Sequence, residues 1–133
     1  MLMSKLRQRL AHDEGGFTLI ELLVVLVIIG ILLAIAVPSY LGFKDRANKR
    51  AAQSNVRAAV PSAEAYYSDS GTYVGMDVTA LKSIDSGLSS SVSTTAADQT
   101  SNSYCIKATV GGFSAYFKGP GGSTTLTKPA GCT

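Results

Sequence analysis

Hydrophobic and polar residues are sharply separated along this chain. Residues 17–37 are almost entirely apolar and carry a single charge, Glu21, whereas the sequence on either side is ordinary and rather polar. In a helix that rises ~1.5 Å per residue, such a run spans roughly 32 Å, which matches the ~30 Å hydrocarbon core of a bilayer. The run is also longer than the apolar core of a secretory signal peptide. The pattern therefore predicts a membrane-spanning helix over residues 17–38.

A second helical pattern follows this run. Over residues 39–70, apolar side chains recur every three or four positions, which predicts an amphipathic helix with one face on a globular head. This stripe consists of Ala52, Val56, Ala59, Val60, Ala63, Tyr66 and Tyr67. Gly30 and Pro38 predict a kink or a weakened segment between the two halves, and Pro61 predicts a second kink rather than a break. We expect the helix to end just before Gly71, which suits a C-cap.

The C-terminal half of the chain has the pattern of loops followed by strands. Residues 71–103 indicate a connecting segment, with one short helical turn within 71–88 and an exposed loop over 89–103, where Ser and Thr dominate. Residues 104–117 then alternate apolar and polar side chains on both sides of Gly111-Gly112. Two glycines between alternating segments predict a hairpin with a type I′ or II′ turn.

A third strand is predicted close to the chain end. The glycine-rich turn 119–122 leads into residues 123–127, so segment 104–133 is expected to form a three-stranded antiparallel meander with one apolar face. Strands this short are not stable alone and must pack on the amphipathic helix. The expected fold class is α+β, with one long N-terminal helix on a small antiparallel sheet.

Composition and charge exclude several classes of protein. The 133 residues suit a single domain, and the dense apolar run disfavours a cytosolic soluble enzyme. The net charge of +3 is too small a balance to indicate nucleic-acid binding by charge alone. A basic cluster after the apolar run could contact DNA, although a solvated or inter-subunit face is favoured. Its members are Lys44, Arg46, Lys49, Arg50 and Arg57.

The sequence contains no catalytic constellation. Its only histidine is His12, so neither a Ser-His-Asp set nor a Cys-His zinc site is expected in the apolar run or the head. Phosphate-binding and dinucleotide-binding motifs are missing from the sequence, and its aspartates lack the spacing of a calcium loop. We expect no enzyme activity, no cofactor and no metal.

The two cysteines indicate an oxidising compartment. Cys105 and Cys132 both lie beyond the predicted membrane helix, which favours one disulfide over two free thiols. Such a bridge would tie the first predicted strand to the chain terminus. It would stabilise the head by roughly 3–4 kcal/mol in the chain-entropy model, which matters for a small core.

Glu21 is the unusual residue of the apolar run. A carboxylate near the bilayer centre costs about 2.5–3.5 kcal/mol on insertion scales, and such residues are commonly functional. The alternative is that Glu21 lies near the membrane interface at a helix N-terminus, where the helix dipole tolerates a negative charge. Both interpretations hold together if another chain offers Glu21 a cation.

The segment from Gly15-Gly16-Phe17 to Val25, after a short basic leader, resembles the processing signal of type IV prepilins and pseudopilins. This resemblance implies that residues 1–16 are a leader removed by a prepilin peptidase, which cuts after Gly16 and methylates the new amine of Phe17. It also implies that Glu21 neutralises the N-terminal amine of a neighbouring subunit during assembly. Pairing of Glu21 with the Phe17 amine of its own helix, four residues away, is the alternative.

The same resemblance implies a function and a set of partners. The expected protein is a structural pilin, a homopolymer assembled by a membrane platform and an ATPase-driven machine. It would sit first in the cytoplasmic membrane with its N-terminus inside, and then in an extracellular type IV pilus. The alternative is a pseudopilin of a type II secretion or DNA-uptake machine. In this family, a disulfide-bounded C-terminal segment is typical of pilins, whereas major pseudopilins of type II secretion more often carry a calcium loop there.

Overall fold

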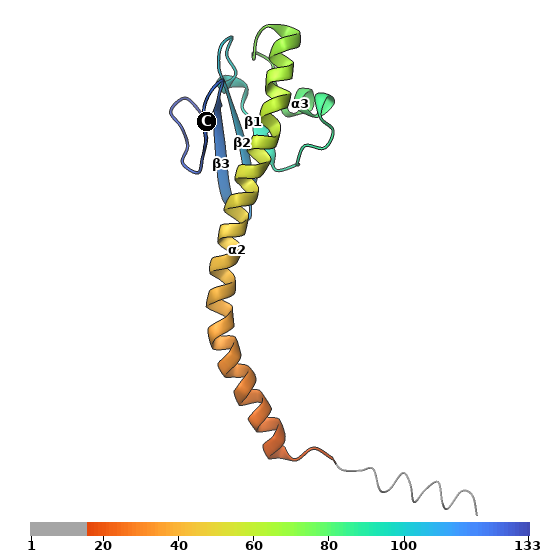
Figure 1. Ribbon diagram of the computed structural model, residues 1–133, viewed down its shortest axis with the longest axis vertical. Helices are drawn as coiled ribbons and strands as arrows, with labels where there is room; N and C mark the ends of the chain where they lie inside the picture. Colours follow the sequence, from red (N-terminus) through yellow and green to blue (C-terminus); the bar gives the residue numbers. More distant parts are fainter. Residues whose placement is uncertain (1–15) are drawn as a thin grey trace, which may run out of the picture. The chain divides into compact units, whose positions relative to one another are not determined.

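The computed structural model describes residues 16–133, and the predicted leader 1–16 therefore lies almost wholly outside the described residues. The chain divides into two compact units, one up to Tyr40 and one from Leu41 to Thr133. Helix α2 (Leu19–Ser70) contributes to both units. The remaining elements, which Figure 1 labels where there is room, all belong to the second unit.

Helix α2 stays α-helical through its glycine and proline positions. Proline has no N–H to donate and normally weakens a helix interior. Immediately after Pro38, the Ser39 hydroxyl donates to the carbonyl of Ile35 at 3.2 Å, a back-bond that often accompanies a bend. The predicted weakening at Gly30 and Pro38 therefore does not take the form of a break, and the kink itself stays a prediction. Pro61 likewise lies inside the continuous helix, as expected.

The end of α2 confirms the predicted C-cap. The helix stops at Ser70, and Gly71 adopts a positive φ of 71°. Its N–H donates to the carbonyl of Tyr67 at 2.7 Å. A left-handed residue that satisfies a terminal carbonyl is the usual way for a helix to end, and glycine adopts it without strain.

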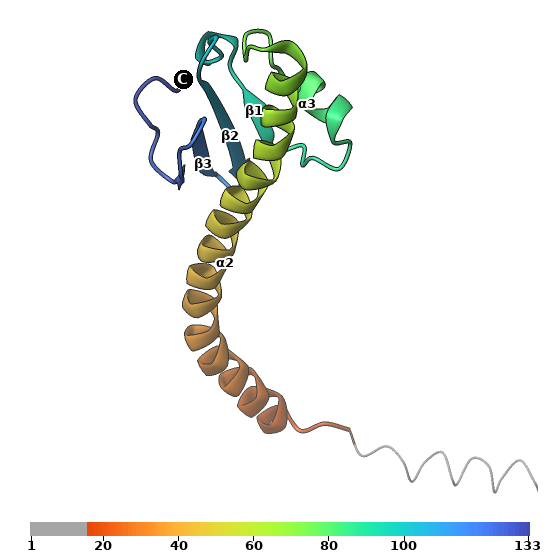
Figure 2. The ribbon, with the colours of Figure 1, turned by 45° about the horizontal axis from the view of Figure 1, so that its top comes forward.

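The head contains a four-stranded antiparallel sheet in the order β1-β2-β3-β4. Its strands are β1 (Val92–Thr94), β2 (Tyr104–Val110), β3 (Phe113–Gly119) and β4 (Thr124–Thr125). Two short helices, α3 (Val78–Ile84) and the 3-10 helix η1 (Ala96–Asp98), lie in the connection between α2 and the sheet. Figure 2 shows the sheet against one side of the upper part of α2.

The central hairpin has the turn that the sequence predicts. Val110 pairs with Phe113, and the two intervening glycines have φ values of 55° and 84°. Two positive φ angles are the signature of a type I′ turn, whose twist matches that of the flanking strands. A Cβ on Gly111 would also collide with the side-chain amide of Asn48 on α2, which would then have to move.

The core of the head lies between α2 and the sheet. Small side chains on α2 (Ala52, Val56, Ala59 and Ala63) share a buried cluster with Ile106, Ala108 and Ala115 of the two central strands. Alanine at these positions lets the helix backbone approach the sheet closely. Larger side chains fill the ends of the cluster, chiefly Tyr73, Met76, Leu81 and Tyr104. Ala52, Val56, Ala59 and Ala63 of the predicted stripe therefore form the core face of the helix, and Tyr66 packs against it. Val60 and Tyr67 of that stripe lie outside the buried cluster.

Two predictions in the C-terminal half are wrong in detail. Residues 89–103 are not simply an exposed loop, because they contain β1 and η1 and bury Val92, Asp98 and Gln99. Val92 pairs with Ala108, so the edge of β2 orders a segment that has little apolar character of its own. The third predicted strand, 123–127, is reduced to Thr124–Thr125. The helical turn expected within 71–88 is confirmed as α3, which inserts Leu81 into the core.

Candidate assembly and processing site

The first turn of α2 is built around a reciprocal cap. Thr18 precedes the helix, and its backbone N–H donates to Oε2 of Glu21 at 2.8 Å. In return, the N–H of Glu21 donates to Oγ1 of Thr18 at 3.3 Å. This is a capping box, in which a Thr and a Glu three residues later satisfy helix-end donors for each other. The Thr-x-x-Glu spacing is visible in the sequence, but the sequence analysis did not use it.

The cap explains how an apolar helix tolerates Glu21. The carboxylate lies in the first turn, where free N–H groups and the positive end of the helix dipole stabilise a negative charge. Within the described part of the chain, its second oxygen, Oε1, has no hydrogen-bond donor. Glu21 thus has a partner inside its own helix and retains an oxygen for another. Helix α2 begins at Leu19, so Phe17 precedes the helix in the uncleaved chain, and pairing of Glu21 with the amine of its own chain stays an alternative.

The residues on either side of the predicted cleavage position are open to a partner. The side chain of Phe17 is 86% exposed. A Cβ added to Gly16 would meet no atom within 4 Å. Within residues 16–133, the fold therefore does not require glycine at position 16. The same observation holds for Gly30.

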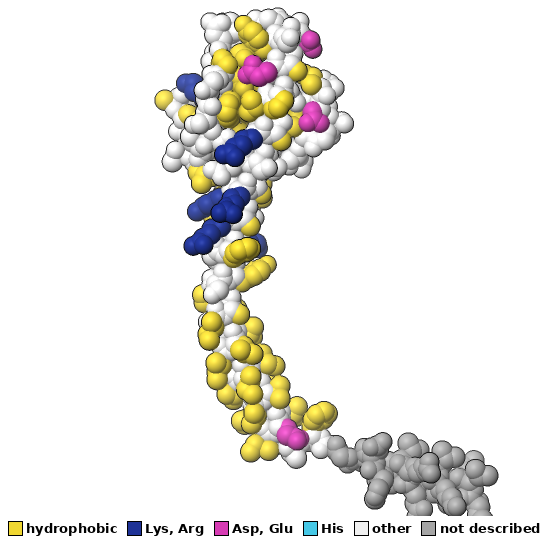
Figure 3. Space-filling view, in the orientation of Figure 1, with side chains coloured by type: hydrophobic (Ala, Val, Ile, Leu, Met, Phe, Trp, Pro, Cys, Tyr) yellow, Lys and Arg dark blue, Asp and Glu magenta, His cyan; other side chains and the backbone are white. Residues whose placement is uncertain are grey.

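The N-terminal part of α2 is apolar on every face and packs on nothing within the described chain. Its large side chains from Leu19 to Val37 are about half or more exposed. Figure 3 shows this surface as a continuous band of hydrophobic side chains. The helix is long and apolar enough to cross a membrane. An exposed apolar surface of this extent needs a lipid or protein partner.

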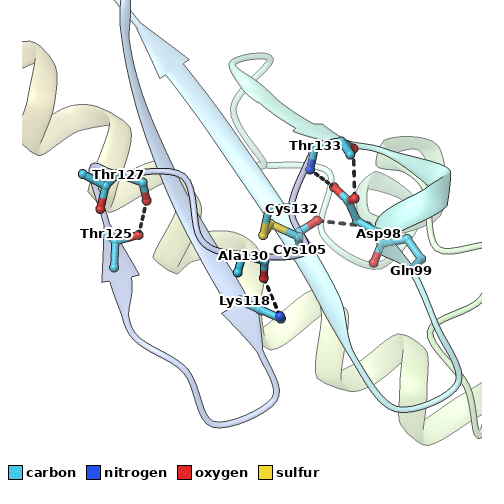
Figure 4. The surroundings of a disulfide bond; sticks show 9 residues. All are labelled: Asp98, Gln99, Cys105, Lys118, Thr125, Thr127, Ala130, Cys132 and Thr133. Carbon is cyan, nitrogen blue, oxygen red and sulfur yellow. Dashed lines mark hydrogen bonds between the residues drawn. A yellow bond between two sulfur atoms is a disulfide. The ribbon is translucent and has the colours of Figure 1, made fainter.

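The predicted disulfide is confirmed. Cys105 on β2 bonds to Cys132, with a Cα–Cα distance of 5.7 Å (Figure 4). Two further contacts hold the same C-terminal segment. Nζ of Lys118 on β3 donates to the carbonyl of Ala130 at 2.6 Å, and Thr133 donates to Asp98 through its N–H and its hydroxyl. The last residues of the chain are thereby fixed across the end of the sheet.

Asp98 is a site residue that the sequence analysis missed. It is buried to 8% exposure in η1, and its two carboxylate oxygens accept the two hydrogen bonds from Thr133 at 2.8 and 2.9 Å. The neighbouring Gln99 donates to the carbonyl of Cys105 at 2.9 Å (Figure 4). No sequence signal marks these polar residues, since their partners lie far along the chain.

A second polar cluster holds α2 to the rest of the head. Glu64 accepts hydrogen bonds from the hydroxyls of Tyr73 (3.1 Å) and Tyr104 (3.0 Å). Burial, and next the hydrogen bond to Glu64, raise the pKa of Tyr73 to about 12. The same causes raise the pKa of Tyr104. Both phenols are therefore held in the neutral form, which is the form that can donate to a carboxylate.

The basic cluster divides between the helix surface and the head. The Nζ atom of Lys49 lies 4.9 Å from the centre of the Phe113 ring, a cation–π contact. Nε of Arg57 donates to Oγ1 of Thr124 at 3.2 Å. Lys44, Arg46 and Arg50 are exposed on α2. Among residues 16–133, the structure brings together no group of three or more His, Cys, Asp or Glu side chains that could hold a metal ion.

Comparisons with known proteins match both halves of the chain. Residues 12–37 match the family model of the prokaryotic N-terminal methylation motif. The chain is 32% identical over 106 residues to the type IV wide pilus major component PilA4 of Thermus thermophilus, a match that covers 80% of this chain and 81% of that protein. It is 41% identical over 58 residues to the type IV major pilin PilA of Myxococcus xanthus, which covers 44% of this chain and 26% of that protein.

A second kind of relative matches over a shorter segment. The type II secretion system core protein G of Escherichia coli is 38% identical over 65 residues, which covers 49% of this chain and 45% of that protein. The chain thus spans less than half the length of this relative and of the Myxococcus pilin, but four fifths of the Thermus pilin. With its N-terminal helix on an antiparallel head, the chain belongs to the type IV pilin and pseudopilin family that carries the prokaryotic N-terminal methylation motif.

Proposed function

We propose that this protein is a pilin, a structural subunit that polymerises through its N-terminal helix into an extracellular filament. The observation that carries the proposal is the apolar part of α2, which is exposed on every face and begins with the Thr18–Glu21 cap. In the monomer, a lipid bilayer covers this apolar surface and removes it from water. In a filament, the N-terminal helices of neighbouring copies pack around each one and bury the same surface.

Processing precedes assembly in this proposal. A prepilin peptidase hydrolyses the bond between Gly16 and Phe17, which converts a neutral peptide nitrogen into a protonated amine, and then methylates that amine without removing its charge. This cation lies beside the first turn of α2, where the positive end of the helix dipole disfavours it. Burial of that amine in a filament therefore requires an anion. The exposure of Phe17 and the open space around Gly16 support access by such an enzyme.

Glu21 supplies the anion. One of its carboxylate oxygens caps its own helix through Thr18, and the other accepts the Phe17 amine of a neighbouring subunit. A buried cation without a partner costs several kcal/mol, so a subunit that lacks the carboxylate is excluded from the filament core. The mechanism combines packing of apolar helices with charge neutralisation and involves no chemical step after processing.

The experiment compares Glu21→Gln with Glu21→Ala, each expressed in place of the wild-type chain in cells that normally make the filament. Gln keeps the capping box, because an amide oxygen accepts the Thr18 N–H, but it removes the charge. Ala removes both. We expect processed monomer of both variants in the membrane at near-normal amounts. We expect filaments, sheared from cells and counted by electron microscopy, to fall by tenfold or more, as for an uncompensated buried charge costing at least ~1.4 kcal/mol.

The opposite results identify other mechanisms. Normal filaments from Glu21→Gln but not from Glu21→Ala would mean that the cap alone matters and that charge neutralisation is wrong. Normal filaments from both variants would remove Glu21 from the assembly mechanism altogether. Mixed expression with wild-type subunits tests neighbour pairing, which predicts that the variant also lowers incorporation of the wild-type chains beside it.

A pseudopilin of a type II secretion machine is the second candidate. The match to the core protein G of that system supports it, but that match covers 49% of this chain. The Thermus pilin match covers 80% of the chain and so includes much of the head. The confirmed Cys105–Cys132 bridge also favours the pilin, given the C-terminal segments typical of the two groups. Long surface filaments distinguish a pilin from a pseudopilin confined to the cell envelope.

A further inference from the structure

A groove runs along one flank of α2 in the head. It has a volume of about 420 Å³ and lies between α2 and the segment that enters β4. Val60, Pro61 and Phe117 supply its apolar lining, and Ser123 and Thr124 supply its outer wall. Arg57 also lines the groove, where the hydrogen bond from its Nε to Thr124 holds the guanidinium at the rim. The groove therefore suits a partner that combines an apolar side chain with a carboxylate.

A surface of that chemistry lies on α3 and the loop before it. We call it the α3 ridge and define it as Val74, Asp77, Ile84 and Asp85. Val74 and Ile84 are among the most exposed large apolar side chains of the head, at 55% and 42%. Asp77 caps α3 through the N–H of Ala80, and Asp85 accepts the N–H of Gly87. These bonds fix the two carboxylates at opposite ends of α3, where Asp85 directly follows Ile84 in the sequence.

The groove and the ridge cannot meet within one molecule. Figures 1 and 2 both show α3 on one side of the upper part of α2, and β3 with the C-terminal segment on the other. The groove belongs to the second side, because Phe117 and Thr124 lie on β3 and β4. A contact between different patches of identical subunits is heterologous, and such contacts generate rings or open helical filaments rather than closed pairs.

We propose that the α3 ridge of a second copy of this chain docks in this groove, with Ile84 against the apolar lining and Asp85 paired with Arg57. The inference rests on the proposed function, since it names the contact between heads in the same polymer. Two observations support the proposal: the opposite charges of Arg57 and Asp85, and the exposed apolar side chain of Ile84, which suits the apolar lining of the groove. The contact fixes the order of neighbouring heads around the helical core, and it is separate from the pairing of Glu21.

A charge swap in the full-length chain tests the pairing. Arg57→Glu or Asp85→Arg alone places like charges in contact and lowers the filament yield by about tenfold. The double variant, Arg57→Glu with Asp85→Arg, restores the pair and the yield. Lys128→Glu is the matched control, because it makes the same charge change at an exposed residue of the head that does not line the groove, and its yield stays close to that of the wild type. Single variants that assemble normally, or a double variant no better than the singles, would overturn the inference.

Cysteine pairs give a second readout that does not depend on assembly yield. Ser83→Cys on α3 and Ser123→Cys in the groove wall, placed in one chain, should yield ladders of linked subunits when filaments are oxidised. Each single cysteine joins at most two copies and serves as the control. Abundant filaments without a ladder would overturn the docking contact but leave the pilin intact. A wild-type chain that forms no filament would instead overturn the proposed function.

Discussion

A single residue at the start of α2 serves two requirements. Glu21 caps its own helix through Thr18, and in the proposed mechanism its second oxygen pairs with the amine of a neighbouring subunit. The cap makes the carboxylate tolerable in a monomer that sits in a membrane, because the first turn supplies donors and a favourable dipole. The proposed pairing of the second oxygen would give the same residue a role in a polymer. A plain membrane anchor would need neither property.

Gly16 gives the clearest test at the residue scale. Gly16→Leu should reduce processing by about tenfold or more, because a side chain beside the scissile bond blocks a peptidase built for glycine. The fold should be unaffected, since a Cβ at this position meets no atom of the described residues within 4 Å. The measurement is the ratio of precursor to mature chain in membrane fractions.

The matched control is Gly42→Leu, at a second glycine whose Cβ would also meet open space. We expect this variant to be processed like the wild type. Equal processing of the wild type, Gly16→Leu and Gly42→Leu would show that glycine at position 16 has no role in cleavage.

At the scale of elements, most of α2 could be predicted from the sequence. The apolar run, the stripe from Ala52 to Ala63 and the glycine that ends the helix are periodic or local signals, and the structure follows them. The hairpin at Gly111-Gly112 was predicted for the same reason. These features depend on residues close together in the sequence, so one amino-acid sequence is enough to predict them.

The remaining elements depend on partners far along the chain. Strand β1 exists because Val92–Thr94 pairs with β2, although only Val92 is strongly apolar. Gly119 is needed because its Cα faces the ring of Tyr104, where a Cβ would collide. The Asp98–Thr133 contact joins residues 35 positions apart. No local pattern signals such pairs, and the sequence analysis accordingly predicted an exposed loop over 89–103.

The attachment of α2 to the sheet should weaken at high pH. Tyr73 and Tyr104 have raised pKa values in the folded head, so folding favours their neutral forms. An unfolded tyrosine has a pKa of about 10. The stabilisation is therefore complete below pH ~10 and is lost as the pH rises through about 12, the folded pKa of Tyr73.

Thermal unfolding of the detergent-solubilised chain, followed by circular dichroism between pH 8 and pH 12, measures this loss. Tyr73→Phe should be less stable at pH 8 and should lose less stability at pH 12 than the wild type. Tyr40→Phe is the control, because Tyr40 is exposed on α2. Parallel curves for Tyr73→Phe and the wild type would contradict the role of the Glu64 cluster.

At the scale of the whole molecule, the two units meet different demands. The N-terminal unit is an apolar helix that packs on nothing within the described chain, and the second unit is a head with its own core and a clamped C-terminus. A small core stabilised by a disulfide suits a protein exposed outside the cell. The Thermus pilus component matches four fifths of this chain, whereas the Myxococcus pilin and the secretion-system protein each match less than half of it.

The intact mass of the protein in surface filaments tests the central claim most directly. Filaments sheared from cells, identified by electron microscopy and dissolved without reducing agent, should contain a chain that begins at Phe17. Its mass should include one methyl group and should lack the two hydrogens lost in the Cys105–Cys132 bridge. Filaments built from another protein, or a mass that includes residues 1–16, would contradict the account.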